Sequence, residues 1–102
     1  MNARELIKTG WNWYAMHNGD WSRVEELLAI RRLNSRATGL WTRENNEGSN
    51  WSREQHESNE GKQERCWEHA QRIVAARGWT ITAPGLWWIV TDEQGNDITP
   101  QI

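Results

Sequence analysis

Residues 58–98, SNEGKQERCWEHAQRIVAARGWTITAPGLWWIVTDEQGNDI, are the stretch that decides the fold. The first half of this stretch carries apolar residues at helical spacing, namely Cys66, Trp67, Ala70, Ile73 and Val74. Gly78 follows the stripe, and glycine commonly closes a helix because it accepts the left-handed conformation. The sequence therefore predicts an amphipathic helix over residues 58–77.

The spacing of apolar residues changes to two after Gly78, which is typical of a half-buried strand. Pro84 and Gly85 form a turn signal, and a second apolar strand follows over residues 86–91. We predict a β-hairpin over residues 79–91 that packs on the helix, because an isolated hairpin is only marginally stable in water. Trp87 and Trp88 are adjacent, and strand side chains alternate between faces, so one of these rings should lie on the less buried face.

The first third of the chain carries two further helical patterns. Residues 2–17 and residues 22–33 each show an apolar stripe, and the second begins with the capping-box pattern Ser22-Arg-Val-Glu25. The short connection between them predicts an antiparallel helical hairpin. Residues 34–61 are polar and rich in loop signals, which predicts a linker that is either mobile or built from short helical turns.

Together these patterns predict a single α+β domain over residues 1–102, with an N-terminal helical hairpin, a polar linker, a third amphipathic helix and a C-terminal β-hairpin. The 102 residues include nine tryptophans and no phenylalanine, so tryptophan supplies much of the apolar surface. The net charge of −2 gives no electrostatic case for general affinity for nucleic acid or membranes. The single cysteine excludes an intramolecular disulfide, and no signal-peptide pattern or membrane-length apolar run is visible, so we expect a cytoplasmic protein.

We expect no catalytic residues, no cofactor and no metal site. Cys66 and His69 have half of a zinc-type spacing, but the chain has no second cysteine and few other imidazoles to complete it. Cys66 also lies on the apolar stripe, where a buried and inert thiol is the usual outcome. The same pair lacks an orienting group for nucleophilic chemistry, so an enzyme is not expected.

The excess of tryptophan favours binding to a protein partner, because tryptophan and arginine dominate the energetics of protein interfaces. The expected contact surface consists of Trp41, Trp51, Trp87, Trp88, Arg36 and Arg43. In size and composition the chain resembles accessory proteins of phages and mobile elements, which often bind and inhibit a host protein. A homodimer that hides its tryptophans in a twofold interface is the structural version of the same hypothesis.

The alternative hypothesis is DNA binding. Glu26-Leu-Leu-Ala29 followed by Asn34-Ser-Arg-Ala-Thr38 resembles the core of a helix-turn-helix. A helix pair followed by a further helix and a hairpin also resembles winged-helix order. These resemblances imply phosphate or base contacts from Arg31, Arg32, Arg36 and Arg43.

Overall fold

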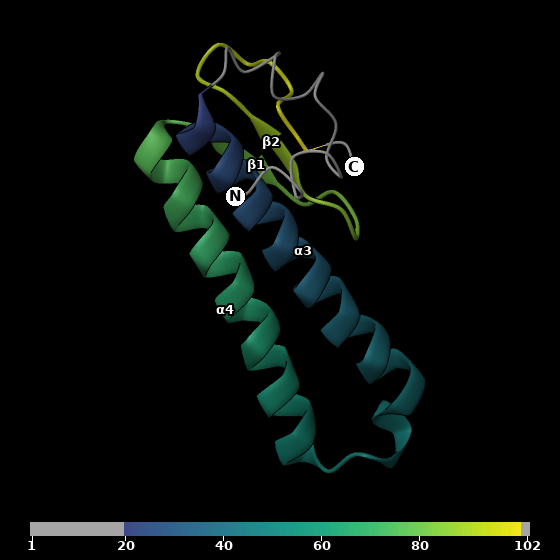
Figure 1. Ribbon diagram of the computed structural model, residues 1–102. Coiled ribbons are helices and arrows are strands. Elements are labelled where there is room, and N and C mark those ends of the chain that lie inside the picture. The colour runs from purple at the N-terminus through teal and green to yellow at the C-terminus, as the bar shows by residue number, and fades with distance from the viewer. Residues whose placement is uncertain (1–19, 101–102) are drawn as a thin grey trace.

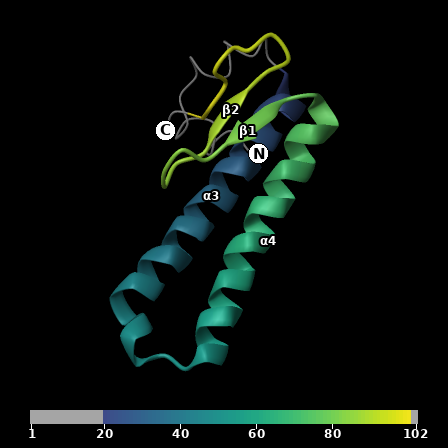
Figure 2. The same cartoon turned by 180° about the vertical axis from the view of Figure 1, so that it is seen from behind.

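The computed structural model describes residues 20–100. Its elements are the helix α3 (Trp21–Glu47), the 3-10 turn η1 (Gly48–Asn50), the helix α4 (Arg53–Arg77) and the strands β1 (Thr80–Thr82) and β2 (Ile89–Thr91). The two long helices run side by side in opposite directions (Figure 1). The small sheet lies across the end of this pair where α3 begins and α4 ends, as the opposite view also shows (Figure 2).

Asp20 caps the start of helix α3, because its side chain accepts a hydrogen bond of 3.1 Å from the backbone N–H of Arg23. The predicted cap at Ser22 is therefore wrong. The helix then continues to Glu47, well beyond its predicted end at residue 33. Leu33 and Ala37 are four residues apart on one face and both pack against the core, so the apolar stripe does not end where the sequence becomes more polar.

Helix α4 begins directly after Ser52, earlier than the predicted start at residue 58. The Ser52 hydroxyl accepts from the backbone N–H of Gln55 at 3.2 Å, and the Gln55 side chain accepts from the Ser52 N–H at 2.7 Å. This capping box satisfies two backbone groups that would otherwise lack helical partners. The helix ends at Gly78, whose φ of 73° is the left-handed conformation expected of a closing glycine.

The predicted arrangement of helices was therefore wrong. The antiparallel pair consists of α3 and α4, and most of the supposed linker at residues 34–61 lies inside these two helices. The predicted helix over residues 2–17 lies outside the described residues. The helix-turn-helix and winged-helix resemblances also fail structurally, because Ala29 and Asn34 lie in one continuous helix where those folds require a turn.

Strands β1 and β2 pair antiparallel within the predicted hairpin region, with Ile81 opposite Val90 at the centre. The backbone N–H of Ile98 donates to the Val90 carbonyl at 2.9 Å, so the C-terminal segment also lies alongside β2. Between these segments, Gly95 adopts a φ of 83° in the turn that begins at Asp92. The sheet is small, and it is stabilised by packing against the helices.

The hydrophobic core lies between the sheet and the adjacent halves of both helices. It consists of Val24, Leu27, Leu28, Ile30, Cys66, Ala70, Val74, Trp79, Trp88, Val90 and Ile98. Among the described residues, no helix has both the length and the apolar character needed to cross a membrane.

Candidate functional site

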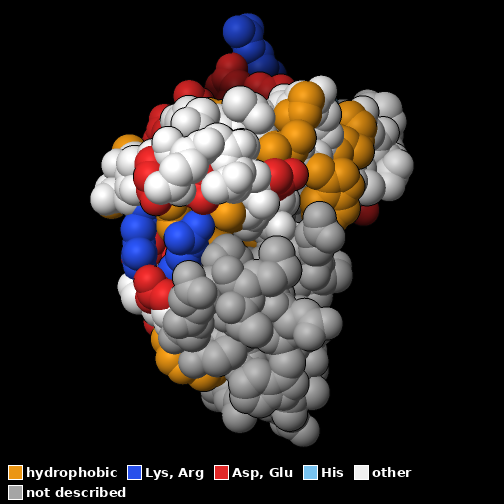
Figure 3. Space-filling model, turned by 90° about the horizontal axis from the view of Figure 1, so that it is seen from above, with side chains coloured by type: hydrophobic (Ala, Val, Ile, Leu, Met, Phe, Trp, Pro, Cys, Tyr) orange, Lys and Arg blue, Asp and Glu red, His pale blue; other side chains and the backbone are white. Residues whose placement is uncertain are grey.

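The connection between β1 and β2, together with the first residue of β2, exposes a group of large apolar side chains beside α3. Leu86, Trp87 and Ile89 are 47%, 64% and 38% exposed, and we call these three residues the apolar face. The Thr38 hydroxyl on α3 donates to the Leu86 carbonyl at 3.2 Å and ties this connection to the helix. Viewed onto the sheet end, the largest group of hydrophobic side chains lies on one side of the surface, and smaller hydrophobic areas lie on the other side, where basic side chains also gather (Figure 3).

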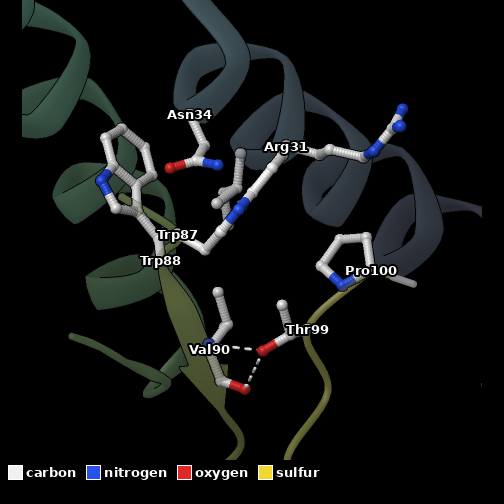
Figure 4. A pocket seen from close by; sticks show the side chains of 8 residues that line it. Arg31, Asn34, Trp87, Trp88, Val90, Thr99 and Pro100 are labelled. Atoms are coloured by element: carbon white, nitrogen blue, oxygen red, sulfur yellow. Dashed lines mark hydrogen bonds between the residues drawn. The ribbon is translucent and has the colours of Figure 1, made fainter. Parts of the chain in front are cut away.

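A hollow of about 470 Å³ opens between α3 and the sheet. It is lined by Ile30, Arg31 and Asn34 of α3 and by Trp87, Trp88, Val90, Thr99 and Pro100 (Figure 4). This volume is in the range of sites that receive small molecules or a large side chain. The hollow and the apolar face share Trp87, so both belong to one site.

Asn34 is the unusual residue of this hollow. Its side chain is almost fully buried, at 4% exposure, and its Oδ1 atom has no hydrogen-bond partner among the described residues. The amide lies at one end of the hollow, next to the two indoles of Trp87 and Trp88 (Figure 4). A buried polar atom without a partner costs about 1–3 kcal/mol, so this amide is a candidate for contact with a donor on a ligand.

Arg31 adds a positive charge at the edge of the hollow. Its side chain is half-buried, and no ion pair joins it to another residue within the part of the chain that the structure describes. The guanidinium extends away from the indoles, on the same side as Pro100 (Figure 4). A bound group with a carboxylate near this edge would therefore meet a cation.

The walls of the hollow are fixed by contacts outside it. The Trp88 ring packs edge-to-face on Trp67 of α4, with ring centroids 5.1 Å apart. The Val90 N–H donates to the Thr99 hydroxyl at 2.9 Å, which holds the C-terminal segment against β2. Because these groups are held in place, the hollow does not need to be formed by its ligand.

A second cluster of polar residues lies at the other end of the helix pair, which we call the hairpin tip (residues 44–63). The two ring nitrogens of His56 lie 2.9 Å from Oε1 of Glu44 and 2.7 Å from the Gly48 carbonyl. The Gln63 amide donates to Oε2 of Glu44 at 3.1 Å and to Oδ1 of the buried Asn59 at 2.6 Å. The helices are thus joined here by hydrogen bonds in place of apolar packing.

The charges at the hairpin tip support one another. The hydrogen bond to Glu44 raises the pKa of His56, and the hydrogen bond to the Gly48 carbonyl adds to this effect. The pKa of Glu44 is lowered, chiefly by its hydrogen bond from His56. Since both nitrogens of His56 face acceptors, the doubly protonated imidazolium is the form that satisfies both.

The structure divides the residues that the sequence proposed for partner binding between these two places. Trp87 and Trp88 line the hollow, where Trp87 is largely exposed and Trp88 is buried. Both precede β2, which begins at Ile89 and not at residue 86 as predicted. Trp51 lies at the hairpin tip, with its ring 5.5 Å from that of His56 and 5.6 Å from the Arg43 guanidinium. Trp51 is half-buried and Arg43 remains exposed, so both side chains form contacts within the chain while part of their surface stays open to solvent.

The remaining predicted residues lie along α3. Trp41 is 44% exposed, and Arg43 also pairs with Glu47 at 2.9 Å. Arg32 and Arg36 are exposed on the same helix, while Arg31 reaches the hollow.

Asn34, Thr99 and Pro100 of the hollow were missed by reasoning from the sequence. A signal for Asn34 was present, because it follows Leu27 and Ile30 by seven and four residues and so continues their buried stripe. Cys66 and His69 differ in burial, because Cys66 is in the core and His69 is exposed, although both line one small hollow between α3 and α4.

Comparison of the chain with protein-family models, curated proteins and solved structures gives no match. A functional assignment must therefore be argued from the geometry of the structure alone.

Proposed function

We propose that this chain is a non-catalytic protein-binding module, and that the hollow beside Asn34 receives an apolar side chain of its partner. The observation that carries the proposal is the position of Trp87, which is 64% exposed at a hollow of about 470 Å³. Exposed tryptophan next to a preformed pocket is the arrangement from which interface hot spots are built.

The chemistry of the hollow indicates what the partner presents. Most of the lining is apolar, so the inserted group should be an aliphatic or aromatic side chain. The unpaired Oδ1 of Asn34 would accept a hydrogen bond from an N–H or O–H of that group, as tryptophan or tyrosine provides. Arg31 at the edge would favour an acidic residue beside it.

Affinity capture from the native host, with quantitative mass spectrometry, tests this proposal. Trp87→Ala should reduce capture of the partner at least about tenfold while leaving the fold intact. Trp21→Ala is a matched control, because Trp21 is also partly exposed on α3. It precedes Asn34 by thirteen residues, which is about 20 Å along a helix. Equal loss with both variants, or no loss with Trp87→Ala, would remove the support for this surface.

Three further measurements separate the more specific role and the alternative roles. Inhibition, as expected of a phage-like accessory protein in the cytoplasm, predicts that the captured protein loses its own activity when the chain binds. A homodimer predicts instead that sedimentation equilibrium gives twice the chain mass and that Trp87→Ala restores a monomer. DNA binding predicts a salt-sensitive mobility shift that requires Arg31, Arg32 and Arg36. The DNA-binding role lacks structural support from a helix-turn-helix, because Ala29 and Asn34 lie in one continuous helix.

A further inference from the structure

Three potential metal ligands meet at the hairpin tip, from both long helices. One donor atom from each of Glu44, His56 and Glu60 lies within 4.8 Å of the others. Glu44 belongs to α3, whereas His56 and Glu60 are four residues apart on one face of α4. This cluster lies outside the proposed protein-binding site and is independent of it.

The histidine ring is oriented as a metal ligand requires. Its Nε2 faces the Gly48 carbonyl at 2.7 Å, and its Nδ1 faces the Glu44 carboxylate at 2.9 Å. Histidine ligands in metal sites almost always donate their second ring N–H to a carbonyl or carboxylate, which fixes the tautomer and the ring plane. With Nε2 donating to Gly48, Nδ1 faces the Glu44 carboxylate and offers its lone pair to an ion once its proton is lost.

The surroundings of the cluster hold these ligands in place. A Cβ atom on Gly48 would lie 2.8 Å from Cε1 of His56, so the ring packs directly on a residue without a side chain. The second oxygen of Glu44 accepts from Gln63 at 3.1 Å, and Gln63 in turn donates to the buried Asn59. Such outer contacts are what distinguish a metal site from acidic residues that merely lie near one another.

We propose that Glu44, His56 and Glu60 bind one divalent transition-metal ion, and that zinc fits this set best. Imidazole and carboxylate are both zinc ligands, at about 2.0–2.2 Å, whereas magnesium and calcium prefer oxygen alone. Ligand atoms of a tetrahedral zinc lie roughly 3.3–3.6 Å apart, so a small closure of the cluster completes the geometry. The ion takes the place of the Nδ1 proton, which leaves to solvent, and water fills the fourth position.

The consequence is a cross-link between α3 and α4 at the end of the pair that the hydrophobic core does not reach. The core residues of both helices lie on the sheet side, and the hairpin tip is held by hydrogen bonds. An ion that binds the folded chain and not the unfolded chain stabilises it in proportion to the logarithm of the ion concentration. Bound zinc would therefore hold α3 and α4 together at the hairpin tip.

Calorimetric titration of the full chain with zinc chloride, together with thermal melting, tests the site. The wild type should bind one zinc ion per chain and melt at a higher temperature as zinc is added. Glu60→Gln removes one ligand without removing the bonds among Glu44, His56 and Gly48, and it should weaken zinc binding by at least about tenfold. Glu54→Gln makes the same charge change about one and two-thirds turns earlier on α4 and should bind as the wild type does.

Cobalt substitution identifies the donor atoms. The cobalt form of the wild type should show the visible absorption of a tetrahedral nitrogen–oxygen site, and His56→Ala should lose it. Zinc binding that is equal in the wild type and Glu60→Gln would overturn the proposal. So would an intense near-ultraviolet cobalt–thiolate band, because it would assign the metal to Cys66. The absence of any zinc effect on melting or titration heat would overturn it as well.

Discussion

Nδ1 of His56 lies 2.9 Å from Oε1 of Glu44 and joins α4 to α3 at the end of the helix pair farthest from the sheet (Figure 1). The opposite end is joined by apolar side chains such as Leu27, Ala70 and Val90, each of which is fully buried. The two ends of one helical hairpin are therefore held by different forces. Substitutions at the tip and in the core should consequently have separable effects.

Gly48→Ala should destabilise the protein. The new Cβ would lie 2.8 Å from Cε1 of His56, so the imidazole must move and its hydrogen bonds to Glu44 and Gly48 must lengthen. Overpacking of this kind costs about 1–3 kcal/mol. Urea denaturation measures the loss, and hydrogen exchange should show that amides of the hairpin tip become less protected. An unchanged unfolding free energy would mean that the His56 ring does not pack on Gly48 in solution.

Gly39→Ala should have the opposite effect. Gly39 lies inside α3, and a Cβ built there meets no atom within 4 Å. Alanine in a helix interior is more stable than glycine by about 0.5–1 kcal/mol, because it restricts the unfolded chain more and exposes less backbone. Urea denaturation of the wild type and Gly39→Ala gives the sign of the change in unfolding free energy. Destabilisation would indicate that α3 is not a continuous helix at this point. It would then favour the linker that the sequence predicted over residues 34–61.

Trp88→Ala and Trp87→Ala should differ sharply in stability, although the residues are adjacent. Trp88 is 9% exposed and packs edge-to-face on Trp67, and loss of a buried tryptophan side chain typically costs about 3–5 kcal/mol. Trp87 is 64% exposed, so its replacement should change stability by less than about 0.5 kcal/mol. Thermal melting of both variants tests which of the two rings the segment before β2 turns toward the core. Equal destabilisation would show that both rings are covered.

Stability should fall at acidic pH through Asp92. Burial alone would raise the pKa of this carboxyl, but hydrogen bonds from Asn96 and Gln94 and the charge of Arg23, 3.5 Å away, outweigh burial and lower it. A carboxyl whose pKa is lower in the folded state contributes stability that is present in full above the ordinary aspartate value of about 3.9. This contribution is lost as pH falls below that value and through the folded pKa.

Asp92→Asn isolates this contribution. The variant should be less stable than the wild type at pH 7, and the difference should shrink as melting is repeated at successively lower pH between about 5 and 2. Asp97→Asn provides a comparison within the same turn region, because Asp97 does not pair with Arg23. A difference between the wild type and Asp92→Asn that is independent of pH would contradict the assignment.

The sequence predicted the sheet end of the molecule better than the hairpin tip, for a physical reason. The stripe from Cys66 to Val74 and the alternation after Gly78 reflect burial of apolar groups, which periodicity detects. At the tip, the contacts among Glu44, His56 and Asn59 connect polar residues, and no hydrophobic period marks them. Periodicity therefore predicted a linker where the structure has two helices.

A local signal for the second helix was nevertheless present. Ser52 and Gln55 match a capping box, and the structure forms both of its hydrogen bonds. The polar composition after residue 52 outweighed this signal in the prediction. Of the candidate site, Trp87 and Trp88 were predicted from a strand over residues 86–91, although both lie just before β2, whereas Asn34 was missed because its helix was predicted to end at residue 33.

Asn34→Leu should stabilise the protein and weaken partner binding at the same time. The buried Oδ1 of Asn34 has no hydrogen-bond partner among the described residues, and replacing such an atom by an apolar group of similar shape recovers about 1–2 kcal/mol. If the amide serves a partner, the same change should reduce affinity capture. A core position at which stability and binding move in opposite directions is expected where a polar group is retained for recognition.

Asn59→Leu is the matched control, because Asn59 is similarly buried but its Oδ1 accepts from Gln63 at 2.6 Å. Its replacement leaves the Gln63 amide with one partner fewer, and it should destabilise the protein by about 1–3 kcal/mol without changing partner capture. Urea denaturation of both variants decides the point. If Asn34→Leu is destabilised as much as Asn59→Leu, the Asn34 amide is satisfied within the chain, and the hollow then has no buried polar group reserved for a ligand.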